Sequence, residues 1–344
     1  MRFPKPPAAL LGLAALLALP TVQADERVKV LASFSILADM VENVGGEHVE
    51  VATLVGADGD AHVYSPRPTD ARALAEADLV VFNGLRFEGW MERLVDSSDY
   101  AGPLVVTTDG IEPPASGGHE AHDHGHDHGH DDHDHGDQDP HGWQDLANGE
   151  VYVANIRDGL IEADPDNAEA YEANAERYLE EIDAADAEIR ELLDEIPAGT
   201  SVITGHDSFG YFAAAYDLRF LSPVGLSTEA DPSAANMAEL IDLIGEQDVR
   251  ALFHENMTSP AIIMQLAEET GLPIAGTLYA DALASEGEAS TWLGMMRHNA
   301  RTLHDALAEP GHGDHDHDHD HDHDHDHDHD HDHDHDHQDH GHAH

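Results

Sequence analysis

"DPDNAEAYEANAERYLEEIDAADAEIRELLDEIP", residues 164–197, lies near the middle of the chain and decides how the rest of it is organised. From Ala168 to Ile196 no Gly or Pro interrupts it. Its apolar residues recur at intervals of three or four: Ala168, Tyr171, Ala175, Tyr178, Ile182, Ala185, Ile189, Leu192 and Ile196. This spacing predicts one amphipathic helix about 45 Å long, at about 1.5 Å per residue. Asp164 or Asp166 would cap its start, and Pro197 with Gly199 would end it.

The segments on both sides of this helix alternate between short apolar runs and helical patterns. Short β-branched runs bounded by turn residues predict strands within 28–34, 49–55, 78–84 and 103–109. In the second half, further short apolar runs predict strands within 201–207, 218–224, 250–256 and 272–280. Amphipathic helices are predicted at 35–45, 68–77, 233–247 and 260–271. Strands that alternate with helices indicate mostly parallel sheets whose faces the helices cover.

The predicted fold is therefore α/β, with two lobes, each a mostly parallel sheet flanked by helices, joined by one long rigid backbone helix. We expect a first lobe at 25–163, the linker helix at 164–196 and a second lobe at 197–308. A stiff helix would hold the lobes at a nearly fixed angle. The alternative is a free coiled-coil segment, which the alanine-rich seam disfavours because few large side chains would fill the contact between helices.

The N-terminal residues 1–24 are typical of a cleavable signal peptide. Arg2 and Lys5 precede an apolar stretch too short to span a bilayer comfortably, and "VQA" ends at Ala24, before Asp25. A short membrane anchor is the alternative. The chain has no Cys, which excludes disulfides, thiolate ligands and a lipid-modified cysteine. We therefore expect a soluble monomer in the periplasm.

The charge of the chain limits its partners. There are 71 acidic and 15 basic residues, and the formal charge is −56. Such a surface repels nucleic acid and anionic lipid and attracts cations. No nucleic acid partner is expected.

Two His-rich segments stand apart from the α/β pattern. The tail 309–344 alternates His with Asp, and we expect it to be disordered; an expression tag is the alternative. The other segment is a loop at 117–139. Neutral imidazoles bind borderline metals such as Zn²⁺, Cu²⁺ and Ni²⁺, so we expect auxiliary low-affinity sites in both. In the loop the histidines are His119, His122, His124, His126, His128, His130, His133 and His135.

Outside these segments, three histidines and one aspartate share a position in the pattern. His62, His141, His206 and Asp281 each lie at the end of a predicted element, two in each lobe. Loops at the carboxyl ends of parallel strands are where such sheets bind ligands. Three imidazoles and one carboxylate form a tetrahedral set suited to Zn²⁺. A single histidine at a strand end more commonly only hydrogen-bonds, so it is their joint placement that predicts a metal site. Asp60 is an alternative fourth ligand.

The remaining histidines have simpler interpretations. His254 lies on an apolar strand, and we expect it to be buried and hydrogen-bonded; the alternative is that it reaches the cleft together with Glu255. His298 and His304 lie on the last helix, where they would be solvated or packed. His48 has no metal-like surroundings in the sequence.

At this point the sequence resembles a known family, the metal-specific solute-binding proteins of ABC importers called cluster A-I, and within it the zinc-binding members. The motifs that carry the resemblance span nearly the whole mature chain. They are "KVLASFSILADMVENVGGEHVEVATLVGADGDAHVYSPRPTD" (29–70), "DPHGWQD" (139–145), the long helix, "TGHDSFGYFAAAYDL" (204–218), "FHEN" (253–256) and "MMRHNARTLHDAL" (295–307).

The resemblance implies two α/β lobes, a rigid helix and a metal between the lobes. It places the four ligands on His62, His141, His206 and Asp281. Manganese-binding members typically have a glutamate at the third position, where this chain has His206, and a nitrogen-rich set favours zinc. Zinc-binding members often carry a His/Asp-rich insertion before the second ligand. The fourth ligand varies among them, and the His-Asp tail departs from the family pattern.

The sequence therefore predicts high-affinity periplasmic capture of Zn²⁺ and its delivery to an ABC transporter permease for zinc uptake. A periplasmic zinc chaperone is a further expected partner. The alternatives are a manganese-binding importer component, a zinc-buffering or adhesion protein of the same fold, and a zinc hydrolase. No HExxH motif is present, and four ligands leave no open position for a reacting water, so we predict that the chain is not an enzyme.

Overall fold

The structure is a computed structural model, and it describes residues 27–112 and 138–308. The predicted signal peptide (1–24), the eight loop histidines from His119 to His135 and the tail (309–344) lie outside the described residues.

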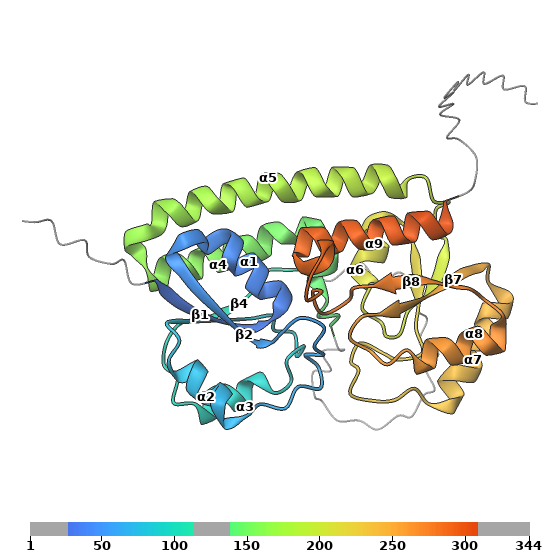
Figure 1. Ribbon diagram of the computed structural model, residues 1–344, viewed down its shortest axis with the longest axis horizontal. Helices are drawn as coiled ribbons and strands as arrows, with labels where there is room; N and C mark the ends of the chain where they lie inside the picture. The colour runs from blue at the N-terminus through green and yellow to red at the C-terminus, as the bar shows by residue number, and fades with distance from the viewer. Residues whose placement is uncertain (1–26, 113–137, 309–344) are drawn as a thin grey trace, which may run out of the picture. The chain divides into compact units, whose positions relative to one another are not determined.

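A parallel four-stranded sheet forms the first lobe (Figure 1). Its strand order is β2-β1-β3-β4, and helices follow the strands along the chain. Every strand and helix predicted in this lobe is present; α3 was not predicted. The elements are β1 (Val28–Phe34), α1 (Ser35–Gly45), β2 (Val49–Val55), α2 (Pro68–Ala75), β3 (Leu79–Phe82), α3 (Met91–Ser97) and β4 (Leu104–Val106).

The second lobe repeats this topology with the order β6-β5-β7-β8, again all parallel. The four predicted strands and both predicted helices are confirmed. The elements are β5 (Ser201–Ile203), α6 (Gly210–Tyr216), β6 (Arg219–Leu221), α7 (Ala234–Glu246), β7 (Val249–Glu255), α8 (Ala261–Thr270) and β8 (Ile274–Leu278). Each sheet thus brings four strand ends to one edge, and the loops that leave those ends can meet.

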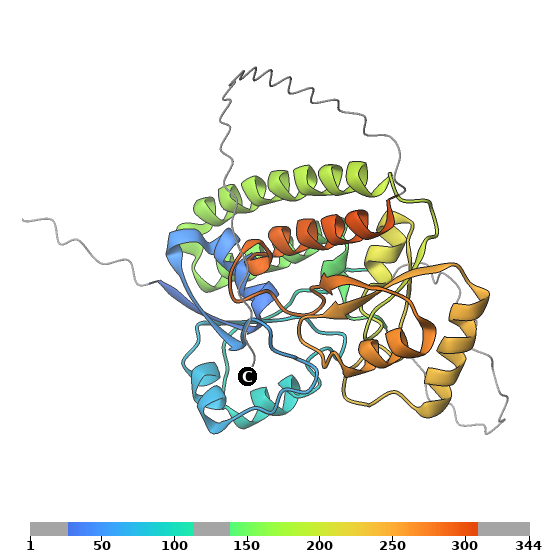
Figure 2. The same cartoon turned by 45° about the vertical axis from the view of Figure 1, so that its right-hand side comes forward.

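The three longest helices of the described residues are α4 (Gly149–Ala163), α5 (Ala168–Leu193) and α9 (Trp292–Leu307). The long helix α5 packs on α1 and α4 of the first lobe and on α9, which returns from the second sheet. Figures 1 and 2 show α5 and α9 side by side. The buried face of α5 follows the predicted spacing, except that Leu193 rather than Leu192 is buried at its end.

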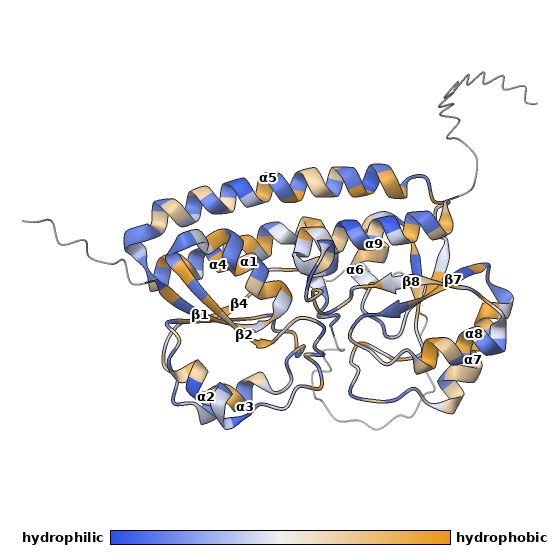
Figure 3. Ribbon diagram, viewed as in Figure 1, coloured by the Kyte–Doolittle hydropathy of each residue, from blue (hydrophilic) through white to orange (hydrophobic). Residues whose placement is uncertain are grey.

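Most buried apolar side chains belong to one continuous cluster that runs through both lobes. It contains Phe34 of β1, Trp143, the inner face of α5, Phe253 of β7 and Trp292 of α9. Figure 3 shows the amphipathic character of α5, with both hydrophilic and hydrophobic residues along its length. A smaller cluster lies under α7 and α8. Because the lobes share a core, they are held by packing rather than by a free hinge.

The predicted lobe boundaries, after residues 163 and 196, stay a prediction. No helix in the described part of the chain is long and apolar enough to cross a membrane.

One contact between the lobes involves a partly buried carboxyl group, that of Asp39. Asp39 of α1 accepts a hydrogen bond from the backbone N–H of Trp292, the first residue of α9, at 2.9 Å. Burial raises the pKa of Asp39 from 3.8 to about 6, against the lowering effect of this hydrogen bond. Ionised Asp39 therefore opposes folding, and its contribution to the free energy of unfolding falls as the pH rises from 3.8 to about 6.

Asp39→Asn is expected to raise the free energy of unfolding at pH 7 by about 1 to 3 kcal/mol, because the amide oxygen still accepts the bond and carries no charge. The gain should vanish near pH 4. Urea unfolding of both proteins at the two pH values measures it. If the two proteins differed in free energy of unfolding by the same amount at both pH values, burial of the Asp39 charge would not be the cause of the difference.

Candidate metal site

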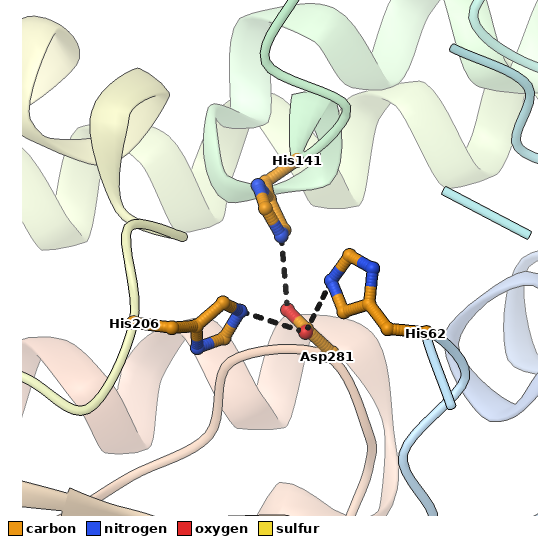
Figure 4. Close-up of side chains that lie close together, drawn as sticks. All are labelled: His62, His141, His206 and Asp281. Atoms are coloured by element: carbon orange, nitrogen blue, oxygen red, sulfur yellow. Dashed lines mark ion pairs between the residues drawn. The ribbon is translucent and has the colours of Figure 1, made fainter. Parts of the chain in front are cut away.

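Four buried side chains from both lobes converge on one point. His62, His141, His206 and Asp281 are each at most 5% exposed, and one ligand atom from each lies within 4.8 Å of the others. Figure 4 shows the three imidazoles around the Asp281 carboxylate. His62 follows β2, His141 follows β4, His206 follows β5 and Asp281 follows β8. The structure thus brings together the four residues that the sequence singled out.

The spacing of the ligand atoms is that of a small coordination shell. The Nε2 atoms of His206 and His62 lie 3.0 and 3.4 Å from Asp281 Oδ2, and the Nε2 of His141 lies 3.6 Å from Oδ1. A tetrahedral ion with bonds of about 2.0 to 2.1 Å requires ligand atoms about 3.3 to 3.4 Å apart. The centroids of the three rings are 5.3 to 5.7 Å apart, so the imidazoles surround the carboxylate evenly.

His206 is fixed by a carboxylate on the neighbouring strand. Its Nδ1 lies 2.7 Å from Oε2 of Glu255, the last residue of β7, which is 3% exposed. The other oxygen of Glu255 accepts the backbone N–H groups of Gly205 and His206 at 3.0 and 3.1 Å. Nδ1–H of His206 therefore donates to Glu255, and the lone pair of Nε2 is available at the centre of the cluster once that nitrogen is deprotonated.

His141 is fixed in the same way by Asp139. One oxygen of Asp139 lies 2.7 Å from Nδ1 of His141 and also accepts the His141 backbone N–H at 2.9 Å. Asp139 in turn rests against Gly210 at the start of α6, where a Cβ would come within 2.5 Å of its other oxygen. A glycine in the second lobe thus makes room for the carboxylate that orients a histidine of the first.

His62 has a different environment. Its backbone N–H donates to Asp60 Oδ1 at 2.9 Å, and the Thr228 hydroxyl donates to Asp60 Oδ2 at 2.7 Å. Both oxygens of Asp60 are used in this way, and Asp60 lies outside the group of four ligand atoms. The His62 ring packs edge-on against Phe87, with ring centroids 4.6 Å apart.

The backbone around Asp281 is held on both sides. Ala280 O accepts from the Trp143 indole at 2.9 Å and from the Gln144 amide at 2.7 Å. On the other side, the Leu283 N–H donates to the Ser35 hydroxyl at 3.0 Å. Trp143 and Gln144 lie two and three residues after His141, so the position of Asp281 is tied to the loop that carries His141.

Charge dominates the centre of this site. Burial alone would lower the pKa of His206, but Glu255 and Asp281 raise it well above its ordinary value. Burial alone would raise the pKa of Asp281, but His206 and His141 hold it well below its ordinary value. The three Nε2 atoms and both Asp281 oxygens are buried without a hydrogen-bond partner. A tetrahedral cation can take one ligand atom from each residue, the three Nε2 atoms and one Asp281 oxygen, and it must displace any proton on His206 Nε2.

The other histidines lie elsewhere. His298 Nε2 is 3.2 Å from the Thr277 carbonyl, and His304 Nε2 is 2.9 Å from Glu195. His48 packs edge-on against Tyr171. His254 points away from the site, and its Nδ1 is buried without a partner, although a satisfied hydrogen bond was expected. Its neighbour Glu255, which the sequence offered only in the alternative that both residues reach the cleft, is the residue that reaches the site, because successive side chains on a strand face opposite sides.

Two parallel-sheet lobes with a buried cluster of three imidazoles and a carboxylate between them define a metal-binding protein of the solute-binding class. The chain belongs to the ZnuA family, described as the periplasmic component A of the zinc-uptake complex, whose sequence model matches residues 30–306. It is thus the substrate-binding protein of a metal ABC transporter and not an enzyme, and the transporter's permease and ATPase are its partners.

Similar proteins carry names that refer to different metals. The chain is 31% identical over 293 residues to the manganese-binding lipoprotein MntA of Halalkalibacterium halodurans, covering 84% of this chain and 91% of that one. It is 31% identical over 283 residues to the iron-binding protein YfeA of Yersinia pestis, covering 81% and 86%. Its fold is similar to that of the periplasmic zinc binding protein TroA from Treponema pallidum, with a TM-score of 0.73, 26% identity and coverage of 82% and 100%. The choice of metal therefore has to be argued from the ligand atoms.

In the metal-free protein, His206 is expected to titrate above its ordinary value of 6.5. Glu255→Gln should lower this pKa, because it removes the first of the two charges that raise it. NMR titration of the His206 ring measures the shift. Glu239→Gln, which changes an exposed carboxylate on α7, is the matched control. An unchanged His206 titration in Glu255→Gln would contradict the electrostatic role of Glu255.

Proposed function

We propose that this protein captures Zn²⁺ at His62, His141, His206 and Asp281 in the periplasm and delivers it to the permease of a zinc-uptake ABC transporter. The observation that carries the proposal is the ligand set: three imidazole nitrogens and one carboxylate, all buried, with five polar atoms that lack a hydrogen-bond partner. Nitrogen-rich tetrahedral sets suit zinc.

The arrangement suits the holding of an ion rather than catalysis. Four ligands complete a tetrahedron and leave no position at which a bound water could react. The second ring nitrogens of His141 and His206 are paired with carboxylates, which is the usual support of a zinc-bound imidazole. Because His206 must lose a proton before it binds zinc, affinity is expected to rise with pH.

Manganese is the second candidate, and the relative MntA favours it by its name. Manganese prefers carboxylate and water oxygens, whereas this site offers one carboxylate and three nitrogens. The atoms in the site therefore support zinc, while the sequence relatives support either metal.

The segments outside the described residues have a role in the same proposal. Residues 1–24 would direct export and be removed. The histidines of the loop from His119 to His135 and of the tail would hold zinc weakly, raise its concentration near the site and receive it from a periplasmic zinc chaperone. The working form would be a monomer.

Metal competition tests the proposal directly. A protein without residues 119–135 and 311–344 is expected to hold one Zn²⁺ tightly and to keep it in the presence of excess Mn²⁺. Metal analysis after dialysis against both ions measures this.

His206→Ala should weaken zinc binding by about 100-fold or more, because one ligand is lost and Glu255 is left buried without its partner. His298→Ala is the matched control, and a preference for Mn²⁺ in the parent protein would refute the proposal.

Deletion of the loop alone separates capture from storage. Without residues 119–135 the protein should bind fewer zinc ions in total and load more slowly, while one tight site remains. Zinc titration with a competing chelator measures both. If tight binding disappeared with the loop, the primary site would include the loop histidines.

A further inference from the structure

A cavity of about 530 Å³ lies beside the metal site. Its lining includes three buried residues, His62, Phe87 and Pro140. Exposed residues line it as well, so the cavity leads from solvent to the edge of His62: Arg86, Gly89, Arg93, Gln138 and Glu229. Leu226 and Ser227 of the second lobe complete much of its wall. His141, His206 and Asp281 do not line it.

The three histidines also differ in how firmly they are held. A carboxylate lies 2.7 Å from Nδ1 of His141 and another 2.7 Å from Nδ1 of His206. The hydrogen bonds and ion pairs of the described residues include no such carboxylate for Nδ1 of His62, whose ring contacts Phe87, His141 and His206 instead. His62 is also the most exposed of the four ligands, at 5%.

The backbone of the His62 loop, in contrast, is tied to the second lobe. The Asp58 N–H donates to Leu283 O at 2.9 Å, Asn256 donates to the Asp58 carboxylate at 3.1 Å, and Thr228 holds Asp60. A change at His62 is therefore a rotation of the side chain rather than a displacement of the loop. The cavity provides the space into which the ring can turn.

A strained turn shapes this cavity. Gly84, Leu85 and Arg86 all have positive φ, at 90°, 50° and 63°, which costs a non-glycine residue about 1 kcal/mol or more. Buried Glu88 holds the turn by accepting the backbone N–H groups of Asn83 and Gly84. The turn sets Phe87 against His62 and places Arg86 in the cavity wall.

We propose that the metal enters and leaves through this cavity, and that His62 is the exchangeable ligand: it binds last and dissociates first, while His141, His206 and Asp281 remain in place. This inference rests on the proposed metal site, but not on which metal that site holds. Gln138, three residues after the last loop histidine, His135, lines the cavity, so the chain that leads from these histidines enters the folded protein where the metal would pass.

Narrowing the cavity tests the route in the full-length protein. Leu226→Tyr should slow both zinc loading and zinc loss to a chelator by a similar factor, about tenfold, and leave the dissociation constant unchanged, because Leu226 is not one of the four ligands and narrowing hinders passage equally in both directions. Met264→Tyr, on α8 and 50% exposed, is the matched control. Stopped-flow tryptophan fluorescence follows the core site, since Trp143 lies 5.3 Å from His141 between ring centroids.

A second test uses chemical rescue. With one equivalent of Co²⁺, His62→Ala should regain a three-imidazole tetrahedral visible spectrum when free imidazole is added, because the cavity admits the imidazole to the vacated position. His206→Ala should not, because that ring is 1% exposed and outside the cavity. Circular dichroism confirms that both variants are folded.

The results distinguish the route from the function. Equal rates in Leu226→Tyr and Met264→Tyr, or imidazole rescue of His206→Ala but not of His62→Ala, would overturn the route while tight binding persisted. Failure of the unaltered protein to bind metal tightly would instead overturn the proposed function.

Discussion

The Asp281 carboxylate sets the main constraint on this structure. It is fully buried, neither oxygen has a hydrogen bond, and three imidazoles from two lobes surround it. A buried charge is strongly unfavourable unless opposite charge lies beside it. In the metal-free protein Asp281 and Glu255 raise the pKa of His206 well above its ordinary value and so favour a positive imidazolium beside the carboxylate, and a bound cation would replace that charge. If the lobes separated at this point, the Asp281 carboxylate would either become exposed to solvent or stay buried without the imidazoles that surround it.

The scaffold meets this constraint by fixing the backbone around the site. The core runs through both lobes under α5 and α9, and Trp143 binds the carbonyl of Ala280 next to Asp281. Asp58 and Leu283 join the lobes through a backbone hydrogen bond on the other side. These hydrogen bonds hold the backbone of the four loops in place. Metal exchange therefore requires movement of a side chain rather than of a loop. That is why the difference in support between His62 and the other two histidines has consequences for exchange.

Much of this architecture could be predicted from the sequence. Short apolar runs of the right length, several of them rich in β-branched residues, predicted all eight strands, because buried parallel strands are commonly continuous apolar runs. The three-four spacing gave α5, and the strand-end positions of His62, His141, His206 and Asp281 gave the cluster. The short helix α3 escaped prediction because its seven residues show too few repeats of the helical period.

The supporting residues could not be found in the same way. Glu255 is 49 residues from His206, and only the pairing of β5 with β7 brings them together. The sequence does not state which of His254 and Glu255 faces the site, since that depends on the register of β7 in its sheet. Asp139 lies two residues from His141, yet its role depends on the space that Gly210 leaves at the start of α6. Contacts between distant elements, rather than local pattern, decide these roles.

The pairing of His206 with Glu255 also bears on the choice between zinc and manganese. If the third ligand were a glutamate, its carboxylate would lie beside the buried Glu255 carboxylate, and two like charges would share a site with little solvent. An imidazole avoids this because it donates to Glu255 with one nitrogen and can bind a metal with the other. The donor at this position therefore depends on the pair, and exchange of His206 alone for a glutamate would place two buried carboxylates against each other.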